Sequence, residues 1–316
     1  MNILITGGAG FIGSHIAEHL VSRGDTVTIV DNLATGLAGN ITKSDSLTFI
    51  QGDISDNALV ERTFDNANPE VVIHAAASYK DPNNWERDTK TNVLGGATIV
   101  KACKRTGIRR LIYFQTALCY GLHPALQPIP VDHPLDAANS SYAITKTAAE
   151  QFIRISGIDY ISFRLANIIG PRNLSGPIPT FYKRLSANKP CFVSDTHRDF
   201  VFVKDLVKVV VRAIDGGGET GIYHISSGGD FAIQEVYDAV LKVMNIRPEN
   251  EVKVRPRNPD DAFTILLDPS KTERDFGWKT ATPLETTIQA AVDWYEQYGV
   301  DHTFTHLTSG KEEKPK

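Results

Sequence analysis

The sequence predicts an α/β protein: a doubly wound parallel sheet with a smaller lobe of mixed α+β structure. Three observations support this fold class. Short apolar runs alternate with helical segments through the first half of the 316 residues, as in parallel strands joined by crossover helices. A glycine-rich turn follows the first apolar run, and an aspartate ends the second. Beyond residue 166 this alternation stops, and prolines interrupt a mixed pattern.

The expected strands are short and mostly apolar, which fits strands that are covered on both faces of a parallel sheet. They lie at residues 2–6, 26–30, 47–50, 70–74, 110–114 and 160–165. Helices are expected at residues 11–22, 89–104, 140–155 and 203–214. The last helix could return to the sheet, so we expect the lobe beyond residue 166 to be discontinuous in sequence.

The turn after the first strand carries a phosphate-binding pattern of glycines. Gly7, Gly10 and Gly13 fit G-x-x-G-x-x-G, and Gly8 with the last two fits G-x-G-x-x-G. Missing side chains let a pyrophosphate approach the backbone, and the following helix would point its free N–H groups and positive dipole end at it. The alternative is an ordinary tight turn. Here, however, the strand, the glycines, the helix, the second strand and the acidic residue follow one another in the order that the binding motif requires.

The acid is Asp31. It ends the second strand about twenty residues after the glycine turn, where a ribose 2′-hydroxyl needs a hydrogen-bond acceptor. A carboxylate at this place repels the 2′-phosphate of NADP. We therefore expect the cofactor to be NAD.

These features predict the domain organisation. An NAD-binding domain of the Rossmann type is expected over residues 1–166, with a return segment at about 199–225. A substrate-binding lobe is expected over 167–198 and 226–307. The polar, charged residues 308–316 are expected to form a flexible tail.

Composition excludes several classes of protein. The chain is 41% hydrophobic and 22% charged, as globular proteins are, and its formal net charge of -4 gives no basic footprint for nucleic acid. It has no run of eighteen apolar residues, so no membrane span is expected. Cys103, Cys119 and Cys191 are too few and too scattered for a disulfide framework or a zinc site. We expect a cytoplasmic protein without a metal.

One pair of residues has the spacing of an acid–base device. Tyr142 and Lys146 stand four residues apart in an expected helix, hence on one face of it. A phenol is a poor base at neutral pH because its reference pKa is about 10, but a lysine ammonium and an oxidised nicotinamide beside it would favour the phenolate. Thr116, at a strand end, offers a hydroxyl to the same substrate oxygen. The alternatives are a packed tyrosine, a solvated lysine and a plain strand terminus.

Taken in order, these motifs resemble the extended short-chain dehydrogenase/reductases, and within them the nucleotide-sugar epimerases typified by UDP-glucose 4-epimerase. The resemblance covers about residues 1–300. It is carried by residues 6–13, 31–33, 52–53, 74–77 and 92–93, by Thr116 before Tyr120-Gly121, by Tyr142 with Lys146, and by residues 164–172, 198–205 and 268–271.

The resemblance implies a set of NAD contacts and a catalytic trio, Thr116, Tyr142 and Lys146. The implied cofactor contacts are Gly7, Gly10, Phe11, Ile12, Gly13, Asp31, Asn32, Thr35, Gly36, Asp53, Ile54, Ala75, Ala76, Ala77, Asn92, Tyr142 and Lys146. It also implies a homodimer that forms through the helices near residues 89–105 and 140–155.

The same resemblance implies residues that bind a nucleotide-sugar. Asn167 and Arg198 match positions that hold the substrate's diphosphate, and a guanidinium can grip phosphate oxygens with two donors. The alternative for Arg198 is a surface arginine paired with Asp199 or Asp195. Arg257 is a second candidate for the phosphates, although the sequence around it departs from the usual Arg-x-Gly-Asp.

Phe192 matches the strand that lines the nucleotide base in relatives, and it could equally be a core residue. Residues 264–266 lack the large aromatic of some glucose-type enzymes, which favours tolerance of a bulkier substituent at C2 of the sugar.

The residues after Thr116 bear on the reaction. Sugar-nucleotide dehydratases carry Asp-Glu there, whereas this chain has Ala117 and Leu118, neither of which can transfer a proton. The resemblance therefore implies C4 epimerisation of a UDP-hexose, or of its uronic or N-acetyl derivative, through a transient 4-keto intermediate. A nucleotide-sugar reductase or dehydrogenase with net redox change stays open, as does a catalytically silent NAD-binding regulatory protein, although the latter needs no intact trio.

Overall fold

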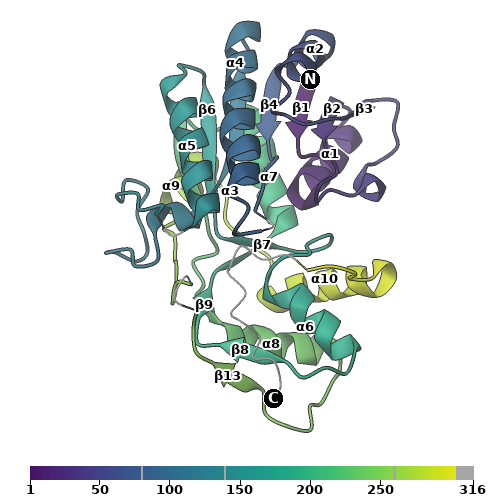
Figure 1. Ribbon diagram of the computed structural model, residues 1–316, viewed down its shortest axis with the longest axis vertical. Helices are drawn as coiled ribbons and strands as arrows, with labels where there is room; N and C mark the ends of the chain where they lie inside the picture. The colour runs from purple at the N-terminus through teal and green to yellow at the C-terminus, as the bar shows by residue number, and fades with distance from the viewer. Residues whose placement is uncertain (80, 139, 259–260, 304–316) are drawn as a thin grey trace.

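The computed structural model describes residues 1–79, 81–138, 140–258 and 261–303 (Figure 1). The tail predicted at residues 308–316 lies outside the described residues. A seven-stranded parallel sheet, in the order β11-β6-β5-β4-β1-β2-β3, forms the larger part of the molecule. Its strands are β1 (Asn2–Thr6), β2 (Thr26–Asp31), β3 (Leu47–Gln51), β4 (Val71–His74), β5 (Arg110–Thr116), β6 (Tyr160–Leu165) and β11 (Gly221–Ile225). The predicted fold class is confirmed.

Helices cover both faces of this sheet, because its strands are apolar on both sides. One layer holds α1 (Phe11–Arg23), α7 (Val203–Ile214) and α9 (Ser270–Phe276), and its core includes Ile16, Leu206 and Phe276. The other holds α2 (Asn57–Ala67), α4 (Gly96–Thr106) and α5 (Ser141–Ile155), which lie side by side in Figure 1. The carboxyl ends of all seven strands therefore meet at one edge, where ligands bind in sheets of this kind.

Two elements differ from the sequence-based expectation. The helix expected at 89–104 begins as a π-helix, η2 (Thr89–Gly95), and continues as α4. The wider turn coincides with Asn92, whose side chain is buried in hydrogen bonds. Helix α2 was not predicted. A short helix, α3 (Trp85–Asp88), precedes η2, and 3-10 turns lie at η1 (Ala38–Asn40) and η3 (Ala117–Tyr120).

Beyond residue 166 the chain forms a second apolar core. This core joins side chains of α6 (Pro177–Ser186), α8 (Ile233–Val243) and α10 (Leu284–Tyr298), among them Phe181, Val236 and Ile288. Small sheets pair β7 (Asn167–Ile169) with β10 (Phe200–Phe202), β8 (Phe192–Ser194) with β13 (Lys253–Arg255), and β9 (His197–Arg198) with β12 (Phe231–Ala232). In Figure 1 these elements gather at the end of the molecule that holds β7, α8 and β13.

The helix expected at 203–214 is α7, and it leads into β11, which pairs with β6 at the edge of the large sheet. The chain thus leaves the sheet after β6 and returns to it. In the described part of the chain, no helix combines the length and apolarity needed to cross a membrane. Within the same residues, no group of three or more His, Cys, Asp or Glu side chains is arranged to hold a metal ion.

Candidate active site

The glycine turn between β1 and α1 packs too closely for side chains. Gly7 has a φ of 71°, and a Cβ there would come within 2.6 Å of the Ala76 nitrogen. A Cβ on Gly13 would overlap the carbonyl oxygen of Gly7. The first intrahelical bond of α1 runs from the Ser14 N–H to the Gly10 carbonyl (3.1 Å), so the N–H groups of residues 11–13 precede it. This cradle fits the diphosphate of NAD.

Asp31 lies beside the cradle and is held rigidly. Its carboxylate accepts hydrogen bonds from the N–H groups of Ala9 (3.0 Å) and Leu33 (2.8 Å). Burial raises the pKa of Asp31, while these two bonds oppose the shift. A Cβ on Gly36 would meet the same carboxylate at 3.0 Å, so the loop after β2 closes over Asp31. Thr35 is half-buried in that loop.

Asn32 and Asp53 come together at the ends of β2 and β3. The amide of Asn32 donates to Asp53 at 3.5 Å, and the ammonium of Lys90 lies 3.9 Å from the same carboxylate. Although partial burial works in the other direction, hydrogen bonds from Ser55 and the charge of Lys90 lower the pKa of Asp53. Ile54 is buried. These residues thus gather where β2 and β3 end, next to Asp31.

The small residues Ala75, Ala76 and Ala77 follow β4 and are half-buried. Their loop is fixed by the Thr6 hydroxyl, which accepts from the Ala76 N–H (3.3 Å) and contacts the His74 ring at 2.7 Å. Burial lowers the pKa of His74 to about 3, so this ring is neutral.

Asn92 has both of its polar atoms committed within the protein. Its amide nitrogen donates to the Ser78 carbonyl (2.9 Å) and to the Thr145 hydroxyl (3.0 Å), and its oxygen accepts from the Ser78 N–H (2.8 Å). Asn92 therefore ties the loop after β4 to α5.

Tyr142 and Lys146 lie on the inner face of α5, whose first turn is capped by the Ser140 hydroxyl at the Ala143 N–H (3.1 Å). Lys146 is 3% exposed, and its ammonium lies 4.1 Å from the centre of the Tyr113 ring. The Tyr113 hydroxyl donates to the Lys146 carbonyl at 3.0 Å, so β5 and α5 are locked together near the active-site edge.

Thr116 is the last residue of β5, as predicted, and is half-buried. Its hydroxyl oxygen accepts from the Leu118 N–H at 3.2 Å, which leaves the hydroxyl proton available for donation to a substrate oxygen. Thr116 pairs in register with Leu165 of β6. The residues that follow Leu165 in the chain therefore lie next to the end of β5.

The protonation states follow from burial. Burial raises the pKa of Tyr142, and the neighbouring Tyr79 and Asp88 add to this. Burial lowers the pKa of Lys146 from its ordinary 10.5 to about 7, against the opposing charge of Glu150. In the protein alone, burial therefore keeps the Tyr142 phenol protonated. From the sequence we expected the lysine and the oxidised nicotinamide together to favour the phenolate. The positive charge of the nicotinamide ring is the contribution that has to come from the bound cofactor.

Asn167 is bonded to the residue that follows Arg198 in the chain, whereas Arg198 is held by another segment. The Asn167 backbone N–H and side-chain amide both donate to the Asp199 carbonyl, each at 3.0 Å. Arg198 forms its ion pair with Asp261 and donates to the Ala262 carbonyl at 3.1 Å. The alternative of a surface arginine paired with Asp199 or Asp195 is wrong, because the Arg198 side chain is largely buried against residues 261–263.

Arg257 is exposed and lies close enough to Arg198 for its charge to act there. Burial lowers the pKa of Arg198, Asp261 and Asp230 oppose this shift, and Arg257 adds to it. The Arg257 guanidinium lies 5.8 Å from the centre of the Phe263 ring. Arg257 thus adds a second positive charge near Arg198, whose own guanidinium is paired with Asp261.

Phe192 is exposed at the start of β8, so the core alternative for it is wrong. The guanidinium of Arg255 lies 3.7 Å from the centre of its ring, and β8 pairs with β13, which carries that arginine. The ring and the cation form a flat surface on which a nucleotide base could stack.

Two residues near the trio escaped the sequence analysis. The ring of Tyr79 lies 6.1 Å from that of Tyr142, a contact between distant segments that left no sequence signal. Glu150 lies four residues after Lys146 on the same buried face of α5. The i, i+4 spacing could have identified Glu150 as a neighbour of the lysine.

A diphosphate cradle after β1, together with Tyr142 and the buried Lys146 on one face of α5, places this chain in the class of NAD-dependent short-chain dehydrogenase/reductases. Comparison with known proteins then gives the family. The sequence model described as "NAD dependent epimerase/dehydratase family" matches residues 3–226, and the chain belongs to this family. The predicted cofactor, NAD, and the resemblance to nucleotide-sugar epimerases are confirmed.

Individual relatives span almost the whole chain. The Bordetella bronchiseptica enzyme WbmH, solved in complex with NAD+, is 52% identical, with a TM-score of 0.92 over 95% of this chain and 99% of that one. WbmG of the same organism, solved with NAD and UDP, is 44% identical, with a TM-score of 0.91 over 98% and 99%. The UDP-glucose 4-epimerase of Halalkalibacterium halodurans is 27% identical over 332 aligned residues, covering 94% of this chain and 96% of the relative.

Proposed function

We propose that this enzyme inverts C4 of a UDP-linked sugar with NAD as its resident cofactor. The observation that carries the proposal is that Tyr142 and the buried Lys146 share one face of α5, beside a strand end that presents Thr116. Ala117 and Leu118 follow Thr116 where an elimination would need an acid and a base. The UDP bound by WbmG and the UDP-glucose 4-epimerase named above support a uridine nucleotide.

Each residue has a part in the mechanism. Bound NAD supplies the acceptor, and then the donor, of a hydride at C4 of the sugar. Tyr142 takes the proton of the 4-hydroxyl and later returns it. The Thr116 hydroxyl donates a hydrogen bond to the same oxygen, which polarises it as the 4-keto group forms. The Lys146 ammonium favours the phenolate form of Tyr142.

Inversion needs a sugar that turns while its nucleotide stays bound. We propose that Asn167, Arg198 and Arg257 hold the diphosphate and that Phe192 with Arg255 faces the base. All five belong to the lobe beyond residue 166 or to its junction with the sheet. We therefore propose residues 1–166 with 199–225 as the NAD-binding domain and residues 167–198 with 226–307 as the substrate lobe, from which α9 crosses back to cover the large sheet. Residues 304–307 of this proposed lobe lie outside the described residues.

The test is Tyr142→Phe, assayed by NMR of the sugar H4 signals. Removal of a general acid–base group lowers kcat by about 100-fold or more. The matched control is Tyr298→Phe, because Tyr298 is exposed and lies at the end of α10. If Tyr142→Phe turned over within a few-fold of wild type, the assignment of the base would be wrong.

The sugar itself is identified by incubation with UDP-glucose, UDP-N-acetylglucosamine and UDP-glucuronate in turn, without added cofactor. Conversion of one of them to its C4 epimer names the substrate. Stoichiometric formation of NADH would instead favour a dehydrogenase with net redox change. Bound NAD without any conversion would favour a silent binding protein.

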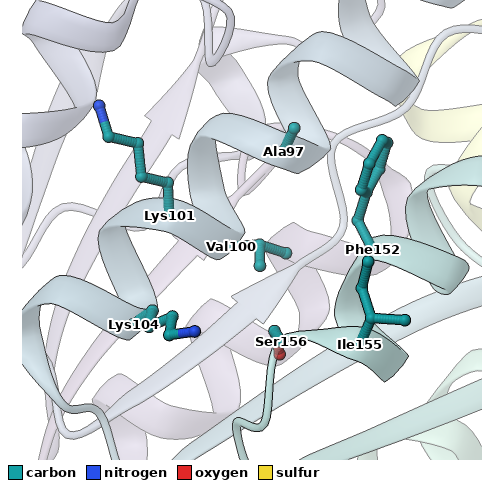
Figure 2. A pocket seen from close by; sticks show the side chains of 7 residues that line it. All are labelled: Ala97, Val100, Lys101, Lys104, Phe152, Ile155 and Ser156. Atoms are coloured by element: carbon teal, nitrogen blue, oxygen red, sulfur yellow. The ribbon is translucent and has the colours of Figure 1, made fainter.

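We infer a homodimer that forms through the outer faces of α4 and α5. Figure 2 shows a groove between these helices, lined by Val100 on α4 and by Phe152 and Ile155 on α5. Ile144, Phe152 and Ile155 are exposed and follow one stripe of α5, and Ile155 is 78% exposed. A face of this kind is covered in four-helix packing against a second copy.

Light scattering tests the dimer. The expected mass is twice the 34.7 kDa of the chain, and Ile155→Asp should shift it towards one chain. A wild-type mass near one chain at micromolar concentration would contradict the inference. We also propose the cytoplasm as the compartment, because all three cysteines are free thiols.

A further inference from the structure

A second buried charge lies on the catalytic face of α5. Glu150 is 0% exposed, and its carboxylate forms an ion pair with Arg164 of β6 (2.6 Å), which is 2% exposed. The Arg164 Nε donates to the other carboxylate oxygen at 3.3 Å, and the Ser162 hydroxyl donates to it at 2.6 Å. The carboxylate is therefore fixed in one position.

This position is one helical turn beyond Lys146. Tyr142, Lys146 and Glu150 follow each other at intervals of four residues, so all three lie on the inner face of α5. The ion-pair partner of Glu150 is Arg164 and not the lysine. The negative charge of Glu150 therefore acts on Lys146 without a direct ion pair, across the one helical turn of α5 that separates them.

The far side of Arg164 is held as firmly. Its Nη1 donates to the Tyr120 hydroxyl at 2.5 Å, and this hydroxyl lies 2.6 Å from the Nε2 of His224. The Nδ1 of His224 lies 3.1 Å from the Asp268 carbonyl, which can only accept. Nδ1 therefore carries the ring proton, and Nε2 accepts from Tyr120.

This direction agrees with the charge of His224. Burial, and then the charge of Arg164, lowers the pKa of His224 to about 3, so the ring carries one proton only. The chain of donors thus runs in one direction, from Arg164 to Tyr120, from Tyr120 to His224 and from His224 to the backbone at Asp268. Each donor in the network that holds Glu150 in place therefore has an acceptor.

Stability alone does not account for this pair. The desolvation of two buried charges offsets much of their attraction, and apolar side chains of similar volume are often as stable in such places. What the arrangement supplies is a carboxylate held in a fixed position one helical turn from Lys146, the buried cation that the reaction needs.

We propose that Glu150, locked by Arg164 and Ser162, is a positioning residue that keeps Lys146 in its ammonium form beside Tyr142. The groups near Lys146 are His74 from β4, Tyr113 from β5 and Glu150 from α5, with Tyr142 one turn earlier on the same face of α5. Since His74 is neutral and both tyrosines are phenols, Glu150 supplies the negative charge among these groups. It raises the pKa of Lys146 against the effect of burial. This inference rests on the proposed roles of Tyr142 and Lys146.

The test is the pH profile of kcat for Glu150→Gln in the NAD-loaded enzyme. Loss of the carboxylate should move the alkaline limb to lower pH by about half a unit or more, with kcat reduced and KM for the sugar nucleotide unchanged. Glu150→Gln leaves Arg164 without its partner and could fail to fold. The double variant Glu150→Gln/Arg164→Met leaves no unpaired charge and should show the same displacement.

Two further variants separate charge from structure. Ser162→Ala removes a hydrogen bond but keeps the carboxylate, so it should lower stability without moving the limb. Glu296→Gln makes the same change at an exposed site. A second readout, which needs no turnover, is the absorbance of the Tyr142 phenolate in the loaded protein, measured against Tyr142→Phe. It should appear at higher pH in Glu150→Gln than in wild type.

If the alkaline limb and the phenolate titration coincide with wild type in the single and double variants, the inference is overturned. That outcome is distinct from failure of the proposed function. If Tyr142→Phe keeps its activity, the function assigned to the trio falls, whatever Glu150 does. If Tyr142→Phe is inactive and the Glu150 variants titrate as wild type, only the role of Glu150 falls.

Discussion

The burial of Lys146 should be measurable as a stability that depends on pH. Lys146 is 3% exposed, and burial lowers its pKa in the folded protein to about 7, whereas the unfolded chain keeps the ordinary value of 10.5. Between these values the unfolded state binds the extra proton, so stability rises with pH. Below about pH 7 the free-energy cost of burying a charged lysine is present in full. This cost disappears as the pH approaches 10.5.

The size of the effect follows from the two pKa values. Linkage gives a gain of about 2 kcal/mol in the free energy of unfolding between pH 7 and pH 9 from this one group. Lys146→Met keeps the volume and removes the proton site. The variant should therefore be more stable than wild type at pH 7, and this advantage should shrink by about 2 kcal/mol at pH 9.

The assay is urea unfolding of the nucleotide-free protein at several pH values between 7 and 9. Other groups that titrate in this window, such as the buried cysteines, are common to both proteins and cancel in the difference. Lys279→Met, at an exposed lysine, is the matched control and should follow the wild-type curve. Parallel curves for wild type and Lys146→Met would refute the argument that the lysine is desolvated.

Three further changes test the binding residues. Gly13→Ala places a Cβ against the Gly7 carbonyl oxygen and should weaken NAD binding by about tenfold or more, measured by calorimetry. An unchanged Kd would show that the turn can shift to make room for the side chain. Asp31→Asn removes the charge that repels a 2′-phosphate, so the ratio of the Kd values for NADP and NAD should fall by about tenfold, and a constant ratio would exclude Asp31 as the discriminator. Arg198→Lys loses the fork that Asp261 orients, so KM for the sugar nucleotide should rise by about tenfold with a smaller change in kcat; an equal loss in both would assign the residue to the chemical step.

The sequence predicted what a single strand–turn–helix unit determines by itself. Gly13 must lack a side chain because the turn folds back on Gly7, and Asp31 ends the neighbouring strand of the same unit. Tyr142 and Lys146 follow from helical spacing alone. Such features need no information about the rest of the chain.

Helix α2 was missed although its signals are local. The Asp56 carboxylate caps its first turn at the Leu59 N–H (3.1 Å), and Val60 and Phe64 form its buried stripe at a spacing of four. A search for the cap would have found it. The π-helical start at Thr89–Gly95 is different, because it accompanies the bonds of Asn92 to Ser78 and Thr145, which depend on tertiary structure.

The substrate-binding residues were harder to predict from the sequence for the same reason. Arg198 pairs with Asp261, which lies 63 residues further along the chain, and its burial depends on segments that pack only in the folded lobe. Glu150 and Arg164 are close in sequence but lie on a helix and a strand, so their contact depends on how α5 packs on the sheet.

Helix α5 brings these observations together, because it buries charged groups and exposes large apolar ones. Its inner face places Ile153 in the core but also buries Lys146 and Glu150. Its outer face exposes Ile144 and Ile155. A buried lysine costs stability, and isoleucines that remain in water contribute none. In the proposed function the cofactor and the sugar engage the inner face, and in the inferred dimer a second copy covers the outer one. Binding and assembly would then each stabilise the helix that carries the proposed catalytic pair, which couples an ordered active site to the state in which the enzyme works.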